Sequence, residues 1–206
     1  IGLVLATVLS LDGAWQYRRQ GTAEWHPAEV PGCVQLDLLR EGLIPDPFIG
    51  RNEKAVQWVG EKDWQYRRVF SVSEEMVTQE HLELVLEGVD TYADIYLNGT
   101  CIQHCDNMFR TWRIPVKGLL RAGDNELLAD FSSVFKVDIP KYLAAPYKLQ
   151  AWPNNDQSDL WISLYARKAG YNYGWDWGPR LITAGLWKSV RLEGWSGPEL
   201  RDVQVK

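Results

Sequence analysis

The sequence has few cysteines, and their spacing gives neither a disulfide framework nor a metal motif. Its 206 residues contain Cys33, Cys101 and Cys105 without a CxxC pair. Three thiols cannot all pair within one chain, and a Cys101–Cys105 bridge would close a very short loop. We therefore expect free, buried thiols. Free thiols favour a reducing compartment, which predicts a cytoplasmic, bacterial location, with a lysosomal or secreted location as the alternative.

Blocks of positive charge are also absent. The formal net charge is -5, and no basic block recurs along the chain. Nucleic acids and anionic membrane surfaces are therefore not expected as partners. The pairs Arg18-Arg19 and Arg67-Arg68 lie in strand-like patterns and are predicted to be solvated edges. The three histidines lack ligand partners at useful spacing, so we predict neither a metal nor a cofactor.

Long hydrophobic runs are missing. The opening IGLVLATVLSL, residues 1–11, is apolar and uncharged but too short to span a membrane. It lacks the basic n-region and the small-residue cleavage site of a signal peptide. Its threonine, serine and β-branched residues predict a first strand, with a truncated signal remnant as the alternative.

Two motifs of enzyme active sites are absent. No GxSxG is present, so a nucleophilic serine elbow is not predicted. Gly170, Gly174 and Gly178 are evenly spaced, but no helix is predicted after them to bind a phosphate. A nucleotide-binding loop is therefore a poor interpretation of these glycines.

Tryptophan and short alternating runs are what the sequence does have. There are 11 tryptophans against 5 phenylalanines, and an indole offers a flat apolar face that can stack on a sugar ring. Asn98-Gly99 after an alternating run is a strong hairpin signal, because both residues tolerate positive φ. Regularly spaced short strands predict an all-β sandwich or barrel. The strand-like runs are residues 13–18, 63–70, 82–86, 92–97, 112–116, 126–131, 181–182, 187–192 and 203–205, with residues 123–125 as a turn.

Three other segments shape the predicted organisation. Residues 34–40 are the one predicted helix near the start, and residues 132–169, with three prolines, are predicted to be a long excursion from the sheet. Such loops often carry function. Residues 194–198 have the composition of a linker, and the tail after them returns to a strand pattern. We therefore predict one domain over residues 1–195 and the start of a second over 196–206.

Carboxylates would matter most if the chain cleaved glycosidic bonds, because that reaction uses a pair of them at a defined separation. Asp176 is the only carboxylate inside an aromatic cluster, the run GYNYGWDWGPR at residues 170–180. No second acidic residue has such a setting. A solvated or turn-capping role is the default on strand-like or turn segments, which hold Glu53, Asp63, Asp90 and Asp94.

The aromatic run supports two interpretations. In the first, the Asp176 carboxylate faces a cavity and accepts hydrogen bonds from neighbouring sugar hydroxyls, while Trp175 and Trp177 supply a stacking face. In the second, a β-bulge buries the tryptophans in the core and Asp176 pairs with Arg180 or Arg167. The residues alone do not choose between the two.

Segments along the whole chain carry a family resemblance. They are LDGAW at 11–15, VPGCV at 30–34, GLIPDP at 42–47, DWQY at 63–66, LEGVDTYADIYLNG at 86–99, DNMF at 106–109, RKAGYNYGWDWGPR at 167–180 and TAGLW at 183–187. From about Leu9 to Trp195 the chain resembles the N-terminal sugar-binding domain of β-mannosidases in glycoside hydrolase family 2. The hairpin and the Gly-x-Trp close are similar across the wider family, whereas the Trp-Asp-Trp-Gly-Pro run points to the mannosidase branch.

The resemblance implies a jelly-roll, galactose-binding-domain-like β-sandwich packed against a TIM barrel that carries both catalytic glutamates. A loop of the sandwich would reach into the barrel pocket. There Asp176 would bind hydroxyls of the terminal mannose of a β-mannoside or manno-oligosaccharide, and Trp175 would line the same subsite, with Trp177 a weaker candidate. No catalytic residue is expected in this chain, which should be inactive alone. Residues 196–206 would be a linker and the first strand of a truncated immunoglobulin-like domain.

Two other functions stay open at this point. The sandwich can be a free-standing carbohydrate-binding module, or a structural support of a catalytic domain with residues 175–177 as a packing corner. The strand pattern at 199–206 favours part of a larger enzyme over a free-standing module. The GWDWGP run favours a sugar subsite over a packing corner. The sequence therefore predicts the N-terminal domain of an exo-acting, retaining β-mannosidase.

Overall fold

Short strands make up most of the described chain. A computed structural model describes residues 6–149, 160–199 and 204–205. The strands are β1 (Thr7–Ser10), β2 (Gly13–Arg19), β3 (His26–Val30), β4 (Trp64–Val72), β5 (His81–Leu86), β6 (Val89–Asp90), β7 (Tyr92–Leu97), β8 (Thr100–Cys105), β9 (Trp112–Pro115), β10 (Gly123–Ser132), β11 (Gly185–Leu186) and β12 (Val190–Trp195). The helices are α1 (Val34–Arg40), α2 (Asn52–Ala55), α3 (Glu74–Thr78), α4 (Val134–Ala144) and the 3-10 helices η1 (Gln57–Glu61) and η2 (Gly170–Tyr173).

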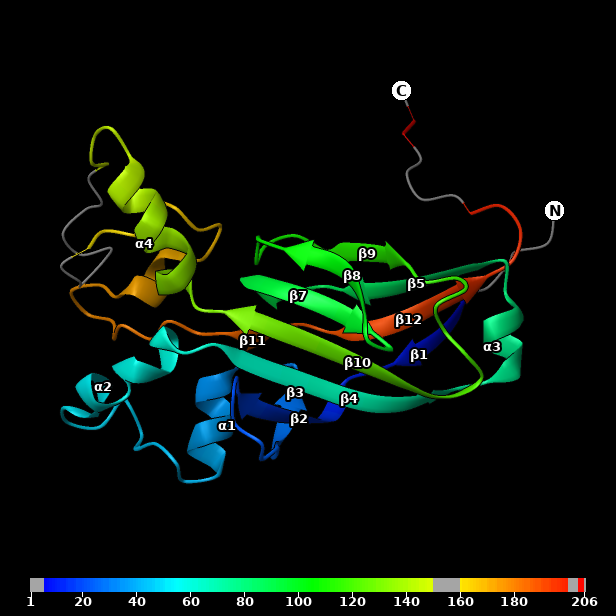
Figure 1. Ribbon diagram of the computed structural model, residues 1–206, viewed down its shortest axis with the longest axis horizontal. Helices are drawn as coiled ribbons and strands as arrows, with labels where there is room; N and C mark the ends of the chain where they lie inside the picture. The colour runs from blue at the N-terminus through cyan, green and yellow to red at the C-terminus, as the bar shows by residue number, and fades with distance from the viewer. Residues whose placement is uncertain (1–5, 150–159, 200–203, 206) are drawn as a thin grey trace.

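The strands form two antiparallel sheets that enclose the main core. Six strands pair in the order β3-β2-β4-β10-β7-β8, and four pair in the order β1-β12-β5-β9 (Figure 1). The two-residue strands β6 and β11 pair separately. The predicted all-β, jelly-roll sandwich is thereby confirmed.

Alternation of side chains explains why these runs become strands. Along β10, Leu127, Ala129 and Phe131 are buried in the core, while the residues between them are more exposed. Between β7 and β8, φ is 50° at Asn98 and 80° at Gly99. The predicted hairpin is therefore confirmed, with the positive φ values that its two turn residues tolerate.

Helices are more frequent than the sequence pattern predicts. α1 spans the predicted residues 34–40, but α4 lies within the segment predicted to be an irregular excursion. Ser133 caps α4, because its hydroxyl accepts a hydrogen bond from the Phe135 amide at 3.2 Å. Pro140 lies inside the helix, and prolines in the segment argued against a helix there. Packing against the second core described below outweighs that local penalty.

Several predicted strand boundaries are wrong. Residues 123–125, predicted to be a turn, begin β10, and residues 194–195, predicted to be linker, end β12. Residues 194–195 belong to β12 because Trp195 pairs with His81 of β5 and is buried. Residues 181–182 form no strand, because Ile182 packs in the second core instead.

The strands predicted at the two ends of the chain lie only partly within the described residues. Of the predicted first strand, residues 1–5 lie outside the described residues, and β1 accounts for most of the rest. Of the predicted tail strand at 203–205, residue 203 lies outside the described residues, and residues 204–205 are not in a strand. The division at residue 195 stays a prediction.

The two arginine pairs do not lie at sheet edges. β2 and β4 are internal strands of the six-stranded sheet. The guanidinium carbons of Arg18 and Arg67 lie 4.3 and 4.2 Å from the ring centroid of Trp25, on which both stack. Arg68 donates a hydrogen bond to the carbonyl of Leu11 at 2.8 Å. The prediction of solvated edges is wrong because both strands are internal, and because Arg18, Arg67 and Arg68 bind a ring or the backbone rather than water alone. Arg19 is exposed, as a solvated side chain would be.

All three cysteines are free thiols. Cys105 is buried and Cys33 is partly buried, but Cys101 is exposed on β8, an edge strand. The expectation of burial is therefore wrong for Cys101. Within the described residues, no helix is both long and apolar enough to cross a membrane.

The helices divide unequally between the two ends of the sandwich. α1, α2 and α4 lie at one end, here called the helical end, while α3 lies at the opposite end (Figure 1). The helical end has a small second core against which α4 packs. Its buried residues are Val134, Ile162, Ala166, Tyr173 and Ile182. The aromatic run at 170–180 is attached to this second core, through Tyr173 and through Ile182 just beyond it.

Candidate functional site

The Trp-Asp-Trp run forms a tight turn rather than a strand. Gly174 ends η2 with φ of 96°, a conformation that costs glycine little. The Trp175 amide then donates a hydrogen bond to the Gly178 carbonyl at 3.1 Å. Asp176 and Trp177 therefore lie at the tip of what we call the tryptophan turn, residues 174–178.

The tip of the tryptophan turn faces solvent. Asp176 is exposed, Trp177 is 82% exposed, and Trp175 is half-buried. The two indole centroids lie 5.3 Å apart at an interplanar angle of 59°. A carboxylate can accept hydrogen bonds from the hydroxyls of a ligand, and an indole face can stack on an apolar ring. This arrangement is suited to a sugar.

The alternative interpretation, a β-bulge with a paired aspartate, does not describe this loop. Among the described residues, no hydrogen bond or ion pair of the Asp176 carboxylate is found. Arg180 forms hydrogen bonds with Glu53 and Gln57 instead. Arg167 is exposed, and its backbone carbonyl accepts a hydrogen bond from the Met108 amide at 3.0 Å. Neither arginine neutralises the Asp176 carboxylate.

Arg180 anchors the C-terminal side of the turn to α2 and η1. Its amide donates to Glu53 Oε1 at 2.7 Å, and its Nη1 donates to Gln57 Oε1 at 2.7 Å. Gln57 Nε2 in turn donates to the carbonyls of Arg180 and Glu53, at 2.7 and 2.8 Å. The guanidinium carbon also lies 5.2 Å from the Phe135 ring centroid on α4. Backbone and side chain of Arg180 are thus both held.

A buried ion pair anchors the N-terminal side. Lys168 Nζ lies 2.5 and 2.6 Å from the two carboxylate oxygens of Asp90 on β6. Thr183 closes the network by donating to Asp90 at 2.6 Å and accepting from Lys168 through its carbonyl at 2.8 Å. Burial lowers the pKa of Lys168, and the Asp90 carboxylate opposes that shift. Because Lys168 precedes the turn and Thr183 follows it, one carboxylate ties both of its flanks together.

The first residues of α1 hold the chain that follows the turn. Gln35 Nε2 donates to the Ile182 carbonyl at 2.7 Å, and the Val34 amide donates to the Ala184 carbonyl at 2.9 Å. These contacts continue the anchoring down to β11. The exposed tip therefore stands on a support that is held from several elements, as a binding site requires.

The sequence singles out the residues at the exposed tip of the tryptophan turn but not the residues that support the turn. Glu53 and Asp90 were predicted to be solvated or turn-capping, yet Asp90 is buried against Lys168 and Glu53 binds the backbone of Arg180. Burial separates Asp90 from ordinary surface carboxylates, and a hydrogen bond to a distant segment separates the partly exposed Glu53. No short-range pattern reports either property. Among the described residues, no group of three acidic, histidine or cysteine side chains could hold a metal.

The fold and the tryptophan turn together define the class of domain. A family model described as glycosyl hydrolase 2 galactose-binding domain-like matches residues 15–188. Because that match covers well over half of the sequence, the chain belongs to this family.

Similar proteins include β-mannosidases. β-Mannosidase B of Thermothelomyces thermophilus is 42% identical over 190 residues, which cover 90% of this chain and 22% of the relative. β-Mannosidase B of Aspergillus fumigatus is 39% identical over 191 residues, with the same coverage. The crystal structure of a β-D-mannosidase from Dictyoglomus thermophilum has a TM-score of 0.87 and 47% identity, over 92% of this chain and 23% of that one.

The coverage shows what part of those enzymes this chain matches. It spans about 22% of the length of the curated relatives and corresponds to the N-terminal domain of family 2 β-mannosidases. An exo-chitosanase from Amycolatopsis orientalis, 17% identical with a TM-score of 0.61, shares the fold. The domain is thus part of a larger polypeptide with other domains.

Proposed function

We propose that this chain is the N-terminal sugar-binding domain of an exo-acting, retaining β-mannosidase. In this proposal Asp176 and Trp175 form part of the subsite for the terminal mannose, and Trp177 flanks it. The observation that carries the proposal is the tryptophan turn: Asp176 is exposed, the rings of its two neighbours in the sequence lie 5.3 Å apart, and the turn is anchored on both sides. The identity to several β-mannosidases supports the choice of sugar.

The chemistry of each side chain follows from its type. The Asp176 carboxylate can accept hydrogen bonds from two adjacent hydroxyls at once, and a charged acceptor makes these bonds stronger than neutral ones. Trp175 is half-buried, so its indole is held in place and can present a fixed apolar face to the sugar ring. Together the two groups would orient a pyranose without taking part in bond cleavage.

Bond cleavage is assigned to the rest of the polypeptide. A retaining mechanism needs a general acid and a nucleophile about 5–5.5 Å apart, and the barrel proposed to carry them takes roughly 250 residues. Hydroxyl contacts far from the reacting bond still raise the rate when they strengthen in the transition state. This chain alone is therefore expected to be inactive, while its turn contributes to turnover in the complete enzyme.

The test is Asp176→Ala in the full-length enzyme. Loss of charge-assisted hydrogen bonds should lower kcat/KM for an aryl β-mannoside on the order of 100-fold. The free energy of unfolding should change by less than about 1 kcal/mol, since the side chain is exposed. Asp124→Ala, an exposed aspartate at the start of β10, is the matched control and should leave both quantities unchanged. Unaltered kinetics in Asp176→Ala would show that the residue is structural.

The alternative of a free-standing module is tested with the isolated chain. If half of the mannose pocket lies elsewhere, residues 1–206 should bind mannose weakly or not at all. A micromolar complex in calorimetry would support an independent carbohydrate-binding module instead. Binding in neither form, together with wild-type kinetics for Asp176→Ala, would leave the supporting sandwich as the function.

A further inference from the structure

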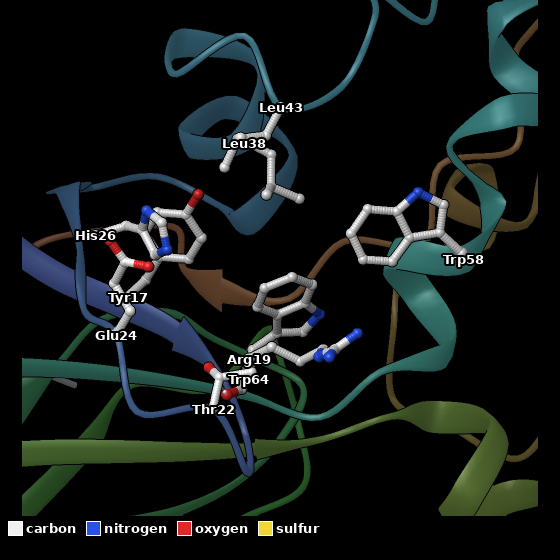
Figure 2. Close-up of a pocket in the computed structure, with 9 residues that line it drawn as sticks. All are labelled: Tyr17, Arg19, Thr22, Glu24, His26, Leu38, Leu43, Trp58 and Trp64. Carbon is white, nitrogen blue, oxygen red and sulfur yellow. Dashed lines mark hydrogen bonds between the residues drawn. The ribbon is translucent and has the colours of Figure 1, made fainter.

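An aromatic cavity lies beside η1. Gln57 of η1 binds Arg180, which follows the tryptophan turn, while the next residue, Trp58, lines this cavity of about 240 Å³. Residues of β2, β4, α1 and η1 surround the cavity (Figure 2).

Four aromatic rings form one wall of this cavity. The ring centroids of His26 and Tyr17 lie 5.6 Å apart, those of Tyr17 and Trp64 lie 6.0 Å apart, and those of Trp64 and Trp58 lie 6.0 Å apart. Tyr17 and Trp64 are buried at the base, whereas His26 and Trp58 are partly exposed at either end of the row. The row therefore offers accessible aromatic faces supported by buried ones.

Polar groups at the rim are of two kinds. The Tyr17 hydroxyl and the His26 ring are already occupied by Glu41 Oε2, at 2.8 and 3.2 Å. Arg19, which pairs with Trp64 across the sheet, and Glu24 are exposed at the mouth. In the described part of the chain, neither of these two side chains has a hydrogen bond or an ion pair. A ligand would therefore meet one free guanidinium and one free carboxylate.

We propose that this cavity binds a single pyranose unit of an oligosaccharide, as a sugar site separate from the tryptophan turn. The aromatic row matches the apolar face of a sugar ring, and hydroxyls can accept from Arg19 and donate to Glu24. The two free groups at the rim carry opposite charges, and Glu41 adds a second carboxylate beside Tyr17 and His26, so a neutral ligand is favoured over an anionic one. The volume lies below the roughly 300–1,000 Å³ of pockets for drug-sized ligands, so one ring fits rather than several.

The test uses the full-length enzyme with Asp176→Ala, so that the proposed mannose subsite contributes less to binding. Titration with β-1,4-mannotriose in calorimetry should show binding with a dissociation constant on the order of 1 mM. Trp58→Ala should weaken that binding about tenfold, because it removes the accessible stacking face. Phe48→Ala, which removes an aromatic side chain that is 74% exposed outside the cavity, should leave the constant unchanged.

Two further variants keep the test decisive if Trp58→Ala fails to fold. Arg19→Ala and Glu24→Gln change exposed side chains, and each should weaken mannotriose binding several-fold with unchanged thermal unfolding. The proposal is overturned if no binding is detected at 50-fold above the expected constant, about 50 mM mannotriose. It is equally overturned if the constant is the same in Arg19→Ala, Glu24→Gln and the parent.

Discussion

The sandwich and its helical end are stabilised by different forces. In the sandwich, long paired strands enclose one large apolar core, with Phe131 and Leu84 fully buried. At the helical end, five buried residues form the second core, and polar contacts such as Lys168 to Asp90 and Arg180 to Gln57 fix the loops. The fold therefore depends mainly on apolar burial. The geometry of the candidate site depends instead on hydrogen bonds between segments that are distant in the sequence.

The buried ion pair should give the largest effect, because it joins the two regions. Lys168→Met leaves the Asp90 carboxylate buried without its cation, which should lower the free energy of unfolding by about 3–5 kcal/mol. Chemical denaturation of the full-length enzyme and of the variant measures the difference. Lys62→Met, an exposed lysine next to η1, removes the same charge and should cost less than about 0.5 kcal/mol.

A double variant sharpens that prediction. In Lys168→Met/Asp90→Asn no unpaired charge remains, so part of the lost stability should return. Equal loss in Lys168→Met and Lys62→Met would mean that the second core, and not the ion pair, holds the helical end.

The Glu53 contact should give an intermediate effect, on activity rather than on stability. Glu53→Ala removes the acceptor of the Arg180 amide and loosens the C-terminal side of the tryptophan turn. Because a small displacement of a positioning contact lowers the rate strongly, kcat/KM should fall about tenfold, with less than about 1 kcal/mol of stability lost. Glu61→Ala at the end of η1 is the matched exposed control. A fall in stability without a change in kcat/KM would make Glu53 merely structural.

A loss of stability at high pH, to which one tyrosine in each region contributes, is the smallest expected effect. Burial raises the pKa of Tyr66 in the sandwich well above its ordinary value, and the nearby Asp37 carboxylate raises it further. Burial also raises the pKa of Tyr92 at the helical end to about 12, where Lys141 opposes the shift. Each raised pKa contributes stability that is complete below about pH 10 and is lost as the pH rises through the folded-state pKa.

Denaturation between pH 8 and pH 12 measures this dependence. The free energy of unfolding should fall above about pH 10, because the unfolded chain releases tyrosine protons that the folded chain retains. Tyr66→Phe and Tyr92→Phe should each flatten the fall, since each removes one tyrosine whose pKa is raised in the folded chain. A fall that only Tyr66→Phe flattens would mean that the sandwich, and not the helical end, shields its tyrosine.

The sequence predicts the sandwich better than the helical end. Alternating runs such as β2 and β4 are visible because strand periodicity is local, and Asn98-Gly99 marks its hairpin through the φ values that two neighbouring residues tolerate. α4 was missed because its stability comes from packing against the second core rather than from its own composition, which includes Pro140.

The candidate site divides in the same way. The local sequence predicts Trp175, Asp176 and Trp177 as site residues. It also contains Gly174, whose backbone freedom allows the turn. Whether the turn faces the core or solvent was left open by those residues. The structure describes an exposed tip, while the role of the tip in binding mannose stays a prediction.

By itself the amino-acid sequence determined the strands, the hairpin and the chemical groups of the tryptophan turn, because each depends on neighbouring residues. Tertiary structure alone decided which groups support them. Asp90 meets Lys168 across 78 positions, and Glu53 meets the Arg180 amide across 127. Such contacts need the packed tertiary structure, because packing brings the partners together and sets how strongly they interact.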